Sequence, residues 1–195
     1  PNVAFDDVPI PAARLAGATG IAVTRVTVGI RRLASAPATD VSLYWATATT
    51  GAVLPDTELD VPFNSIGTVS LDVNGAASVT QLVTIGDGVN TLFTTALNNT
   101  LLGVDFPTFL LGVQLSNPDA NNGVRITSGA DANANVLWGY DTDLTDTESR
   151  FNFGTGQPTA AYYLEIEGTP VMIPTPGAMA LLGLGGLAAS RRRRS

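Results

Sequence analysis

Oxygen-bearing side chains alternate in a loop-like segment near the middle of the chain. Asn117, Asp119 and Asn121 stand at every second position before Gly123, and carboxylate and amide oxygens spaced in this way are suitable ligands for calcium. The spacing departs from the EF-hand pattern, because Asn122 separates the third ligand from the glycine. Ordinary turn chemistry explains the same residues, so the sequence leaves a calcium loop and a plain turn as alternatives.

A second oxygen-rich segment follows at residues 141–148 and holds four carboxylates, namely Asp141, Asp143, Asp146 and Glu148. Their mutual repulsion favours either a bound cation or full solvation, and a solvated loop is the simpler interpretation. We expect no cofactor for this chain. If calcium binds, we expect it at residues 117–123 and 131–148.

Two further pairs have the residue types of a carbohydrate-related site. Glu165 and Glu167 share one face of an expected strand, and glycoside hydrolysis uses two carboxyl groups, although neighbours on one strand usually line a solvated face. Trp138 and Tyr140 also share a strand face and could stack on a sugar, although large rings in β-sandwiches usually belong to the core.

The residue types that are missing narrow the chemistry further. The chain has no Cys and no His, which excludes thiol catalysis, Cys-ligated metal centres and Ser-His-Asp triads. Lys is also absent, so Schiff-base and P-loop chemistry are excluded. We therefore expect no catalytic residues and a protein that is not an enzyme.

Charge is distributed unevenly along the chain. The net charge is −7, but residues 1–169 contain six Arg and 17 acidic residues. This part of the chain would repel a phosphate backbone, so we expect no nucleic-acid partner.

Composition and periodicity predict an all-β fold. With 45% hydrophobic residues, 20 Gly and 12 Pro, the chain can bury a core and has many turn formers. About eight to ten short strands separated by Gly, Pro, Asn and Asp favour an antiparallel two-sheet sandwich, jelly-roll-like in arrangement. We expect strands at residues 21–31, 41–49, 65–73, 78–85, 109–115, 124–127, 136–140, 150–153 and 161–167. Residues 89–97 are the one stretch in which a helical turn is possible.

Three local patterns make sharper predictions. Ala22, Thr24, Val26, Val28 and Ile30 should share one face of the strand at 21–31. The apolar run at 109–115 should form a central strand covered on both faces. Asn74-Gly75 should close a hairpin between residues 65–73 and 78–85.

These elements divide the chain into four parts. Residues 1–20 read as an irregular lead-in or edge strand, 21–169 as the β-sandwich domain, 170–176 as a Pro-rich linker and 177–195 as a tail. Because the sequence opens at Pro1, we expect that an export signal peptide has been removed. The tripeptide at 98–100 fits a glycosylation sequon, a pattern that is also common by chance.

The tail combines an apolar segment with a basic end. Residues 177–190 carry no charge and are followed by Arg191, Arg192, Arg193 and Arg194. As an apolar helix the segment would span roughly 21 Å, short of the roughly 30 Å hydrocarbon core, so its insertion should be marginal. The arginines should stay in the cytoplasm and leave the β-domain on the other side of the membrane. The alternative is that residues 177–189 pack in the core.

Pro174, Thr175 and Pro176, the apolar segment and the final arginines together resemble the PEP-CTERM sorting signal of exported bacterial proteins. The family has Glu where this chain has Thr175. The resemblance implies recognition by an exosortase-like processing enzyme, transient membrane anchoring through the tail, and delivery to the cell surface or the extracellular matrix. We therefore expect a structural surface protein, with a carbohydrate- or calcium-binding module as the alternative and extracellular polysaccharide as its partner.

Overall fold

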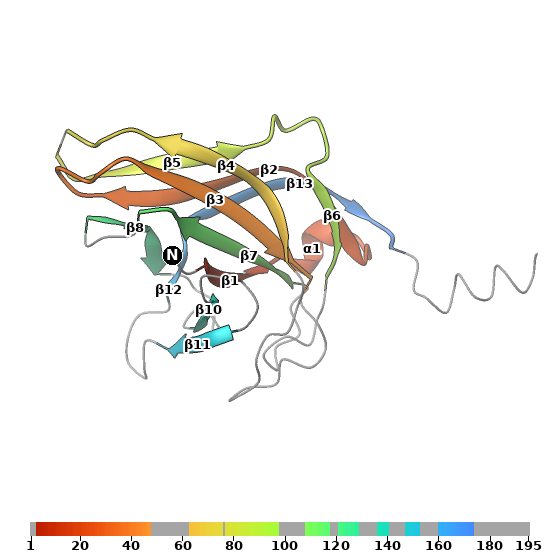
Figure 1. Cartoon of the computed structure of the whole chain (residues 1–195). Coiled ribbons are helices and arrows are strands. Elements are labelled where there is room, and N and C mark those ends of the chain that lie inside the picture. The colour runs from red at the N-terminus through yellow and green to blue at the C-terminus, as the bar shows by residue number, and fades with distance from the viewer. Residues whose placement is uncertain are drawn as a thin grey trace, which may run out of the picture.

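The computed structural model describes residues 3–47, 63–75, 77–97, 108–117, 121–128, 136–140, 147–152 and 160–173. Within these ranges the chain is mostly β-strand, and the one helical turn is α1 (Ala12–Leu15) (Figure 1). This confirms the all-β prediction. Residues 89–97 do not form a helical turn; they contain a bend and the strand β6 (Phe93–Ala96).

One sheet has six strands in the order β11-β10-β1-β7-β3-β4, and every neighbouring pair is antiparallel. Its strands are β1 (Val3–Pro9), β3 (Thr39–Ala46), β4 (Asn64–Leu71), β7 (Thr108–Leu115), β10 (Val136–Tyr140) and β11 (Thr147–Asn152).

The second sheet has five strands built around β2 (Gly20–Arg32). On one side β2 pairs with β13 (Leu164–Val171) and then β8 (Asn122–Val124), and on the other with β6 and then β5 (Val79–Ile85). A small separate ladder joins β9 (Ile126–Ser128) to β12 (Ala160–Tyr162). The 13 residues of β2 therefore set the register of this sheet.

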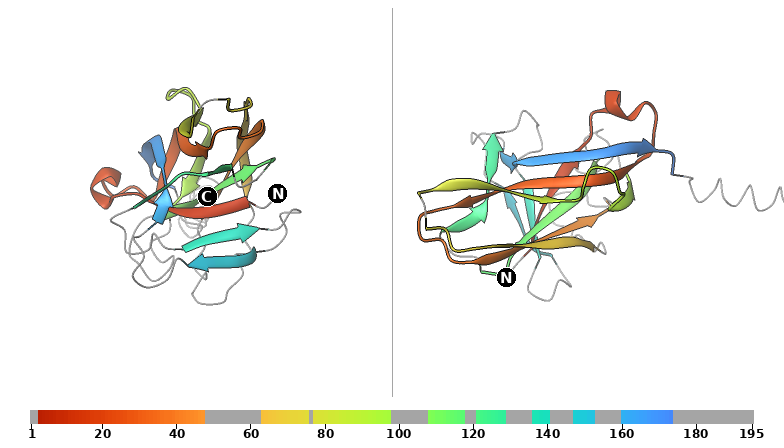
Figure 2. Two further views of the ribbon diagram at one scale, coloured as in Figure 1. Left: turned by 90° about the vertical axis from the view of Figure 1, so that its left-hand side faces the viewer. Right: turned by 90° about the horizontal axis from the view of Figure 1, so that it is seen from above.

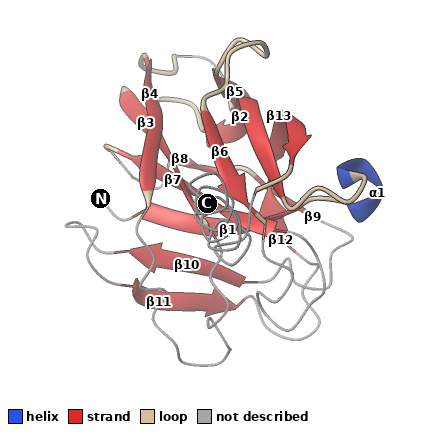
Figure 3. Cartoon of the chain, turned by 90° about the vertical axis from the view of Figure 1, so that its right-hand side faces the viewer, coloured by secondary structure: helices blue, strands red, loops and turns tan. Residues whose placement is uncertain are grey.

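The core lies between the two sheets, which gives the molecule a sandwich-like form. Figures 2 and 3 show β3 and β4 facing β2, β5 and β13, with β10 and β11 beyond β1. Val26, Val28 and Ile30 of β2 belong to the same buried cluster as Leu43 of β3 and Phe109 of β7. Burying side chains of this size contributes about 1.5–3 kcal/mol each, so this cluster holds the sheets together.

The predicted central strand at 109–115 is confirmed. β7 lies between β1 and β3, and seven of its eight residues are buried. Phe109, Leu111 and Val113 join the core cluster. On the opposite face Gly112 lies against Phe5, where an added Cβ would sit 2.6 Å from the Phe5 ring. Both faces of this strand are therefore covered, which explains its continuous apolar sequence.

The predicted alternation of β2 is right only in its second half. Val26, Val28 and Ile30 are buried as expected, but Ile21 and Val23 are buried in place of Ala22 and Thr24. The ladder with β13 shifts at this point, since Glu167 pairs with Arg25 and Gly168 pairs with Val23. Thr24 is therefore an extra residue, and such a bulge exchanges the two faces of a strand.

The predicted hairpin at Asn74-Gly75 is wrong. β4 pairs with β3 and β5 pairs with β2, so the two strands belong to different sheets. The connection between them passes from one sheet to the other. Asn74 serves as a tie in this connection: its Nδ2 donates to the Leu33 carbonyl at 2.8 Å, and its backbone N donates to the Ala36 carbonyl at 2.9 Å.

The ends of the domain also differ from the predicted divisions. β1 is paired on both sides, with β7 and β10, and is not an edge strand. At the other end β13 continues to Val171, and the backbone N of Ile173 donates to Thr19 Oγ1 at 2.9 Å. Residues 170 and 171 therefore belong to the sheet, and Ile173 is tied to the domain through Thr19.

A buried arginine closes the end of the sandwich at which β2 terminates. Arg32 is 2% exposed, and its guanidinium reaches acceptors on three other segments. Its Nη2 donates to the Pro37 carbonyl at 2.6 Å and its Nε to Asn122 Oδ1 at 3.1 Å, while its Nη1 donates to the Asp72 carbonyl at 2.5 Å. Each of these partners is an uncharged oxygen, so peptide and amide dipoles replace the water that the cation gives up.

We predict that Arg32→Met lowers the free energy of unfolding by about 3 kcal/mol or more, because it removes the donor to the Asp72 carbonyl and to Asn122 Oδ1 together with the hydrogen bond to the Pro37 carbonyl. Arg32→Lys should recover only part of this loss, since one ammonium cannot reproduce the fork of a guanidinium. Arg31→Met is the matched control, because Arg31 is exposed on the same strand and should change stability by about 0.5 kcal/mol or less. Urea denaturation measures all three, and equal effects at positions 31 and 32 would contradict the role of Arg32.

Candidate functional surface

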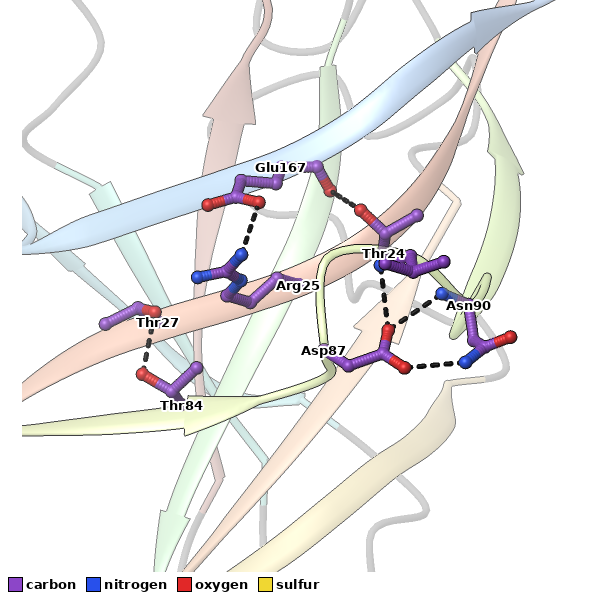
Figure 4. A network of polar contacts seen from close by, with 8 residues as sticks. Thr24, Arg25, Thr27, Thr84, Asp87, Asn90 and Glu167 are labelled. Atoms are coloured by element: carbon purple, nitrogen blue, oxygen red, sulfur yellow. Dashed lines mark hydrogen bonds and ion pairs between the residues drawn. The ribbon is translucent and has the colours of Figure 1, made fainter.

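A network of polar contacts covers the outer face of the five-stranded sheet (Figure 4). We call this surface the polar face and define it by Arg25, Thr27, Thr84, Tyr163, Glu165 and Glu167. Arg25 Nη2 lies 2.9 Å from Glu167 Oε2, and both side chains are about half exposed. Thr24 Oγ1 donates to the Glu167 carbonyl at 3.3 Å, so the bulge residue helps to hold this pair.

Strand register brings these side chains together. Arg25 is opposite Glu167, and Thr27 is opposite Glu165 on one side and Thr84 on the other. Thr27 Oγ1 and Thr84 Oγ1 are 2.9 Å apart and share a hydrogen bond. Opposite-charge and Thr–Thr pairs at directly opposed positions stabilise a sheet modestly. The polar face is thus a product of the β2 ladders.

Tyr163 lies beside Glu165 at one end of the polar face. Its hydroxyl donates to Glu165 Oε1 at 2.9 Å, and this hydrogen bond and the nearby negative charge raise the pKa of Tyr163. A Cβ on Gly29 would approach the Tyr163 Cβ to 3.1 Å. The missing side chain of Gly29 therefore gives this tyrosine its place on the sheet.

The two carboxylates have different partners. Glu165 accepts a hydrogen bond from Tyr163, and Glu167 pairs with Arg25. Both are exposed on the same sheet face, whereas glycoside hydrolysis places an acid and a second carboxyl group on either side of one bond. The arrangement favours the interpretation of Glu165 and Glu167 as parts of a solvated surface that can exchange hydrogen bonds with a ligand.

A tight turn borders the polar face after β5. Asp87 Oδ1 accepts hydrogen bonds from the backbone N of Val89 at 2.8 Å and of Asn90 at 2.7 Å, and Oδ2 accepts one from Asn90 Nδ2 at 2.6 Å. These donors lower the pKa of Asp87 to about 2. Gly88 has φ +79°, and a Cβ there would lie 2.4 Å from Arg25 Nη2, so glycine also leaves room for the ion pair.

Two of the predicted calcium ligands lie close to the Arg32 end of the sandwich. Asn117 Nδ2 donates to the Ala38 carbonyl at 3.5 Å, and the Asn121 carbonyl accepts from the backbone N of Leu33 at 2.8 Å. Both residues therefore take part in loop contacts.

The other predicted ligands, Asp119, Asp141, Asp143 and Asp146, lie outside the described residues. In the described ranges no three acidic, His or Cys side chains form a group that could hold a metal. Calcium binding at these loops stays a prediction.

Trp138 and Tyr140 are on β10, where Trp138 is opposite Phe5 and Tyr140 is opposite Val3. Phe5 and Val3 are both buried. Carbohydrate binding at Trp138 and Tyr140 remains a prediction.

The predicted sorting motif, apolar segment and arginine cluster fall in residues 174–195, outside the described residues, as does the sequon at 98–100. In the described part of the chain, no helix has the length and apolar character needed to cross a membrane.

No protein-family model matches the chain, and no significant match is found among curated proteins or among solved structures.

Sequence reasoning identified Glu165 and Glu167 but missed Arg25, Tyr163 and Asp87. A usable signal existed for Asp87, because Gly-Asp-Gly with an Asn two residues further on is typical of a turn in which the aspartate binds the backbone. Arg25 and Tyr163 gave none, since their positions depend on the bulge at Thr24 and on the packing over Gly29.

We predict that Asp87 contributes a pH-dependent part of the stability. Its pKa is depressed in the folded state from 3.8 to about 2, so its contribution is complete above the unfolded pKa and is lost as the pH falls towards 2. The difference in melting temperature between the wild type and Asp87→Asn should therefore shrink between pH 4 and pH 2. Asp72→Asn, a substitution of an exposed aspartate away from this turn, serves as the control, and a difference that stays constant with pH would contradict the role of Asp87.

Proposed function

We propose that the chain is a non-enzymatic protein of the bacterial surface or extracellular matrix, exported and sorted by its C-terminal tail. The observation that carries this proposal is an uncharged segment of 14 residues, 177–190, placed directly before four arginines at the end of an otherwise acidic chain. Lipid is the environment that such a segment prefers, and arginines beyond it resist transfer across the membrane.

The described domain is compatible with this role. Its last strand is fixed to the domain by contacts between Thr19 and Ile173, because Thr19 Oγ1 donates to the Ile173 carbonyl at 3.2 Å and accepts from its backbone N. The sorting motif begins at the next residue, Pro174. A tail attached directly after these contacts could be removed without loss of any described strand.

The tail also determines the partner and the location that we propose for the chain. The partner is an exosortase-like enzyme that recognises Pro174-Thr175-Pro176, and the membrane holds the tail until processing. The acidic domain stays outside the cytoplasm and binds no nucleic acid. We also propose a jelly-roll arrangement for the two sheets and an apolar helix for residues 177–190.

We predict that the native host releases a chain shortened by about the last twenty residues, as measured by intact mass of the extracellular and membrane pools. Thr175→Glu restores the family motif and should increase the processed fraction, whereas Thr169→Glu adds the same charge outside the motif and should not. Replacing the four arginines by serine should abolish membrane retention. A full-length extracellular pool that none of these changes affects would contradict the proposal.

A second candidate is a carbohydrate-binding module, and the polar face is the observation that favours it. Tyr163 is half-buried beside the exposed carboxylate of Glu165, with the hydroxyl pair of Thr27 and Thr84 and the Arg25–Glu167 pair nearby. Sugars bind surfaces that combine a ring with several hydrogen-bonding groups. The ligand would be an extracellular polysaccharide.

This second function predicts that Tyr163→Ala reduces retention on immobilised polysaccharide, while Met172→Ala, an exposed apolar residue in the same β13 region, leaves retention unchanged. Affinity electrophoresis in gels that contain the polysaccharide measures the effect. Equal migration of the wild type and Tyr163→Ala would exclude the polar face as a sugar site.

A further inference from the structure

The strand β5 has an outer edge that no other described strand pairs with. Its inner edge pairs with β2 through seven consecutive residues, Val79 to Ile85, without a register shift. The sequence of β5 is Val-Thr-Gln-Leu-Val-Thr-Ile, which has no charge, no Pro and no Gly. Regular, uncharged edges rich in β-branched residues are the ones that accept a further strand.

Three of the other edge strands of the two large sheets, β4, β11 and β13, carry features that oppose pairing, and the remaining two, β6 and β8, have only four and three residues. The ladder of β4 shifts at Ile66, and the ladder of β11 shifts beside Glu148. β13 contains a shift and the charged residues Glu165 and Glu167. Bulges and charged residues are the usual means by which edges avoid association. Among the described edge strands of more than four residues, β5 alone has neither feature.

The side chains of β5 also favour a partner. Val83 points into the core and is 1% exposed, whereas Leu82 is 53% exposed and Val79 42% exposed. Leu82 lies opposite Gly29 on β2, so it stands next to a position without a side chain. Two of the five exposed large apolar residues of the described chain are thus on this one strand.

We propose that β5 pairs with β5 of a second copy of this chain, antiparallel and about a two-fold axis at Leu82. The register that uses all seven residues places Leu82 opposite Leu82, Thr80 opposite Thr84 and Val79 opposite Ile85. No charged side chain is opposed to another in this register. The two five-stranded sheets then form one continuous sheet, and each exposed Leu82 covers the other.

A second copy fits this edge better than an unrelated segment because the strand is complementary to itself. Val79 meets Ile85 at the ends, Leu82 meets Leu82 at the centre and Thr80 meets Thr84, a favourable cross-strand pair, while the uncharged Gln81 meets Val83. Residues 1–169 carry 17 acidic residues against six Arg, so two copies repel each other over most of their surface. The neutral β5 edge is a place where they can approach. This inference does not depend on the tail or on the proposed function.

The test uses the full chain and sedimentation velocity over a range of concentrations. The wild type should show a reversible monomer–dimer equilibrium. Leu82→Lys and Leu82→Glu each place two like charges directly opposite each other, so each should weaken the dimer by about tenfold or more. An equimolar mixture of the two variants places Lys opposite Glu and should restore association as a heterodimer. Met172→Lys, which adds a charge at an exposed site away from β5, is the matched control and should dimerise as the wild type does.

Three results would overturn the proposal. The first is a wild type that stays monomeric at every concentration. The second is a dimer that Leu82→Lys leaves intact, because the contact between the copies would then lie elsewhere, for example in the tail. The third is failure of the mixed variants to associate when the circular dichroism of each matches that of the wild type. If a Leu82 variant does not fold, Thr80→Lys mixed with Thr84→Glu places Lys opposite Glu at the neighbouring pair, and this mixture should associate more tightly than either variant alone.

Discussion

The burial of the Arg32 guanidinium is the constraint on which this sandwich depends. Moving a cation out of water is costly unless fixed dipoles replace the solvent, and here the replacements come from two loops that connect the sheets and from the start of β8. Carbonyl oxygens of Pro37 and Asp72 and the amide oxygen of Asn122 accept its hydrogen bonds. The charge can be buried only when these loops are in place, so it links the folding of one loop to that of the others.

This constraint fixes the end of β2, and β2 sets the register of the five-stranded sheet. With Arg32 held, Val26, Val28 and Ile30 face the core, and Thr27 faces Glu165 and Thr84 on the outside. The bulge at Thr24 then brings Arg25 opposite Glu167. The polar face and the neutral edge of β5 therefore both depend on β2. The outward-facing residues of β2 form part of the polar face, and its unbroken ladder with β5 keeps the β5 edge straight and without a bulge.

The sequence predicted those features that depend on local pattern and could not predict those that depend on long-range contacts. The apolar run of β7 identified a central strand, because continuous burial leaves a continuous hydrophobic sequence. Asn74-Gly75 failed as a hairpin signal because Asn74 is engaged by Leu33 and Ala36, some 40 residues earlier in the chain. The alternation of β2 failed at Thr24, since a bulge leaves no reliable mark in one sequence. Arg32 gave no signal at all, because its burial depends on carbonyl groups that every residue possesses.

Hydrogen exchange of single amides tests the central role of Arg32 most directly. The amides of Leu33, Ser35 and Asn74 donate to Asn121, Asn74 and Ala36 in the loops around the guanidinium. If Arg32 holds these loops as one unit, the three amides should exchange only on global unfolding, with the same free energy as the core amides of β2. Exchange that is orders of magnitude faster than in β2 would show that the loops open on their own, and would contradict the account.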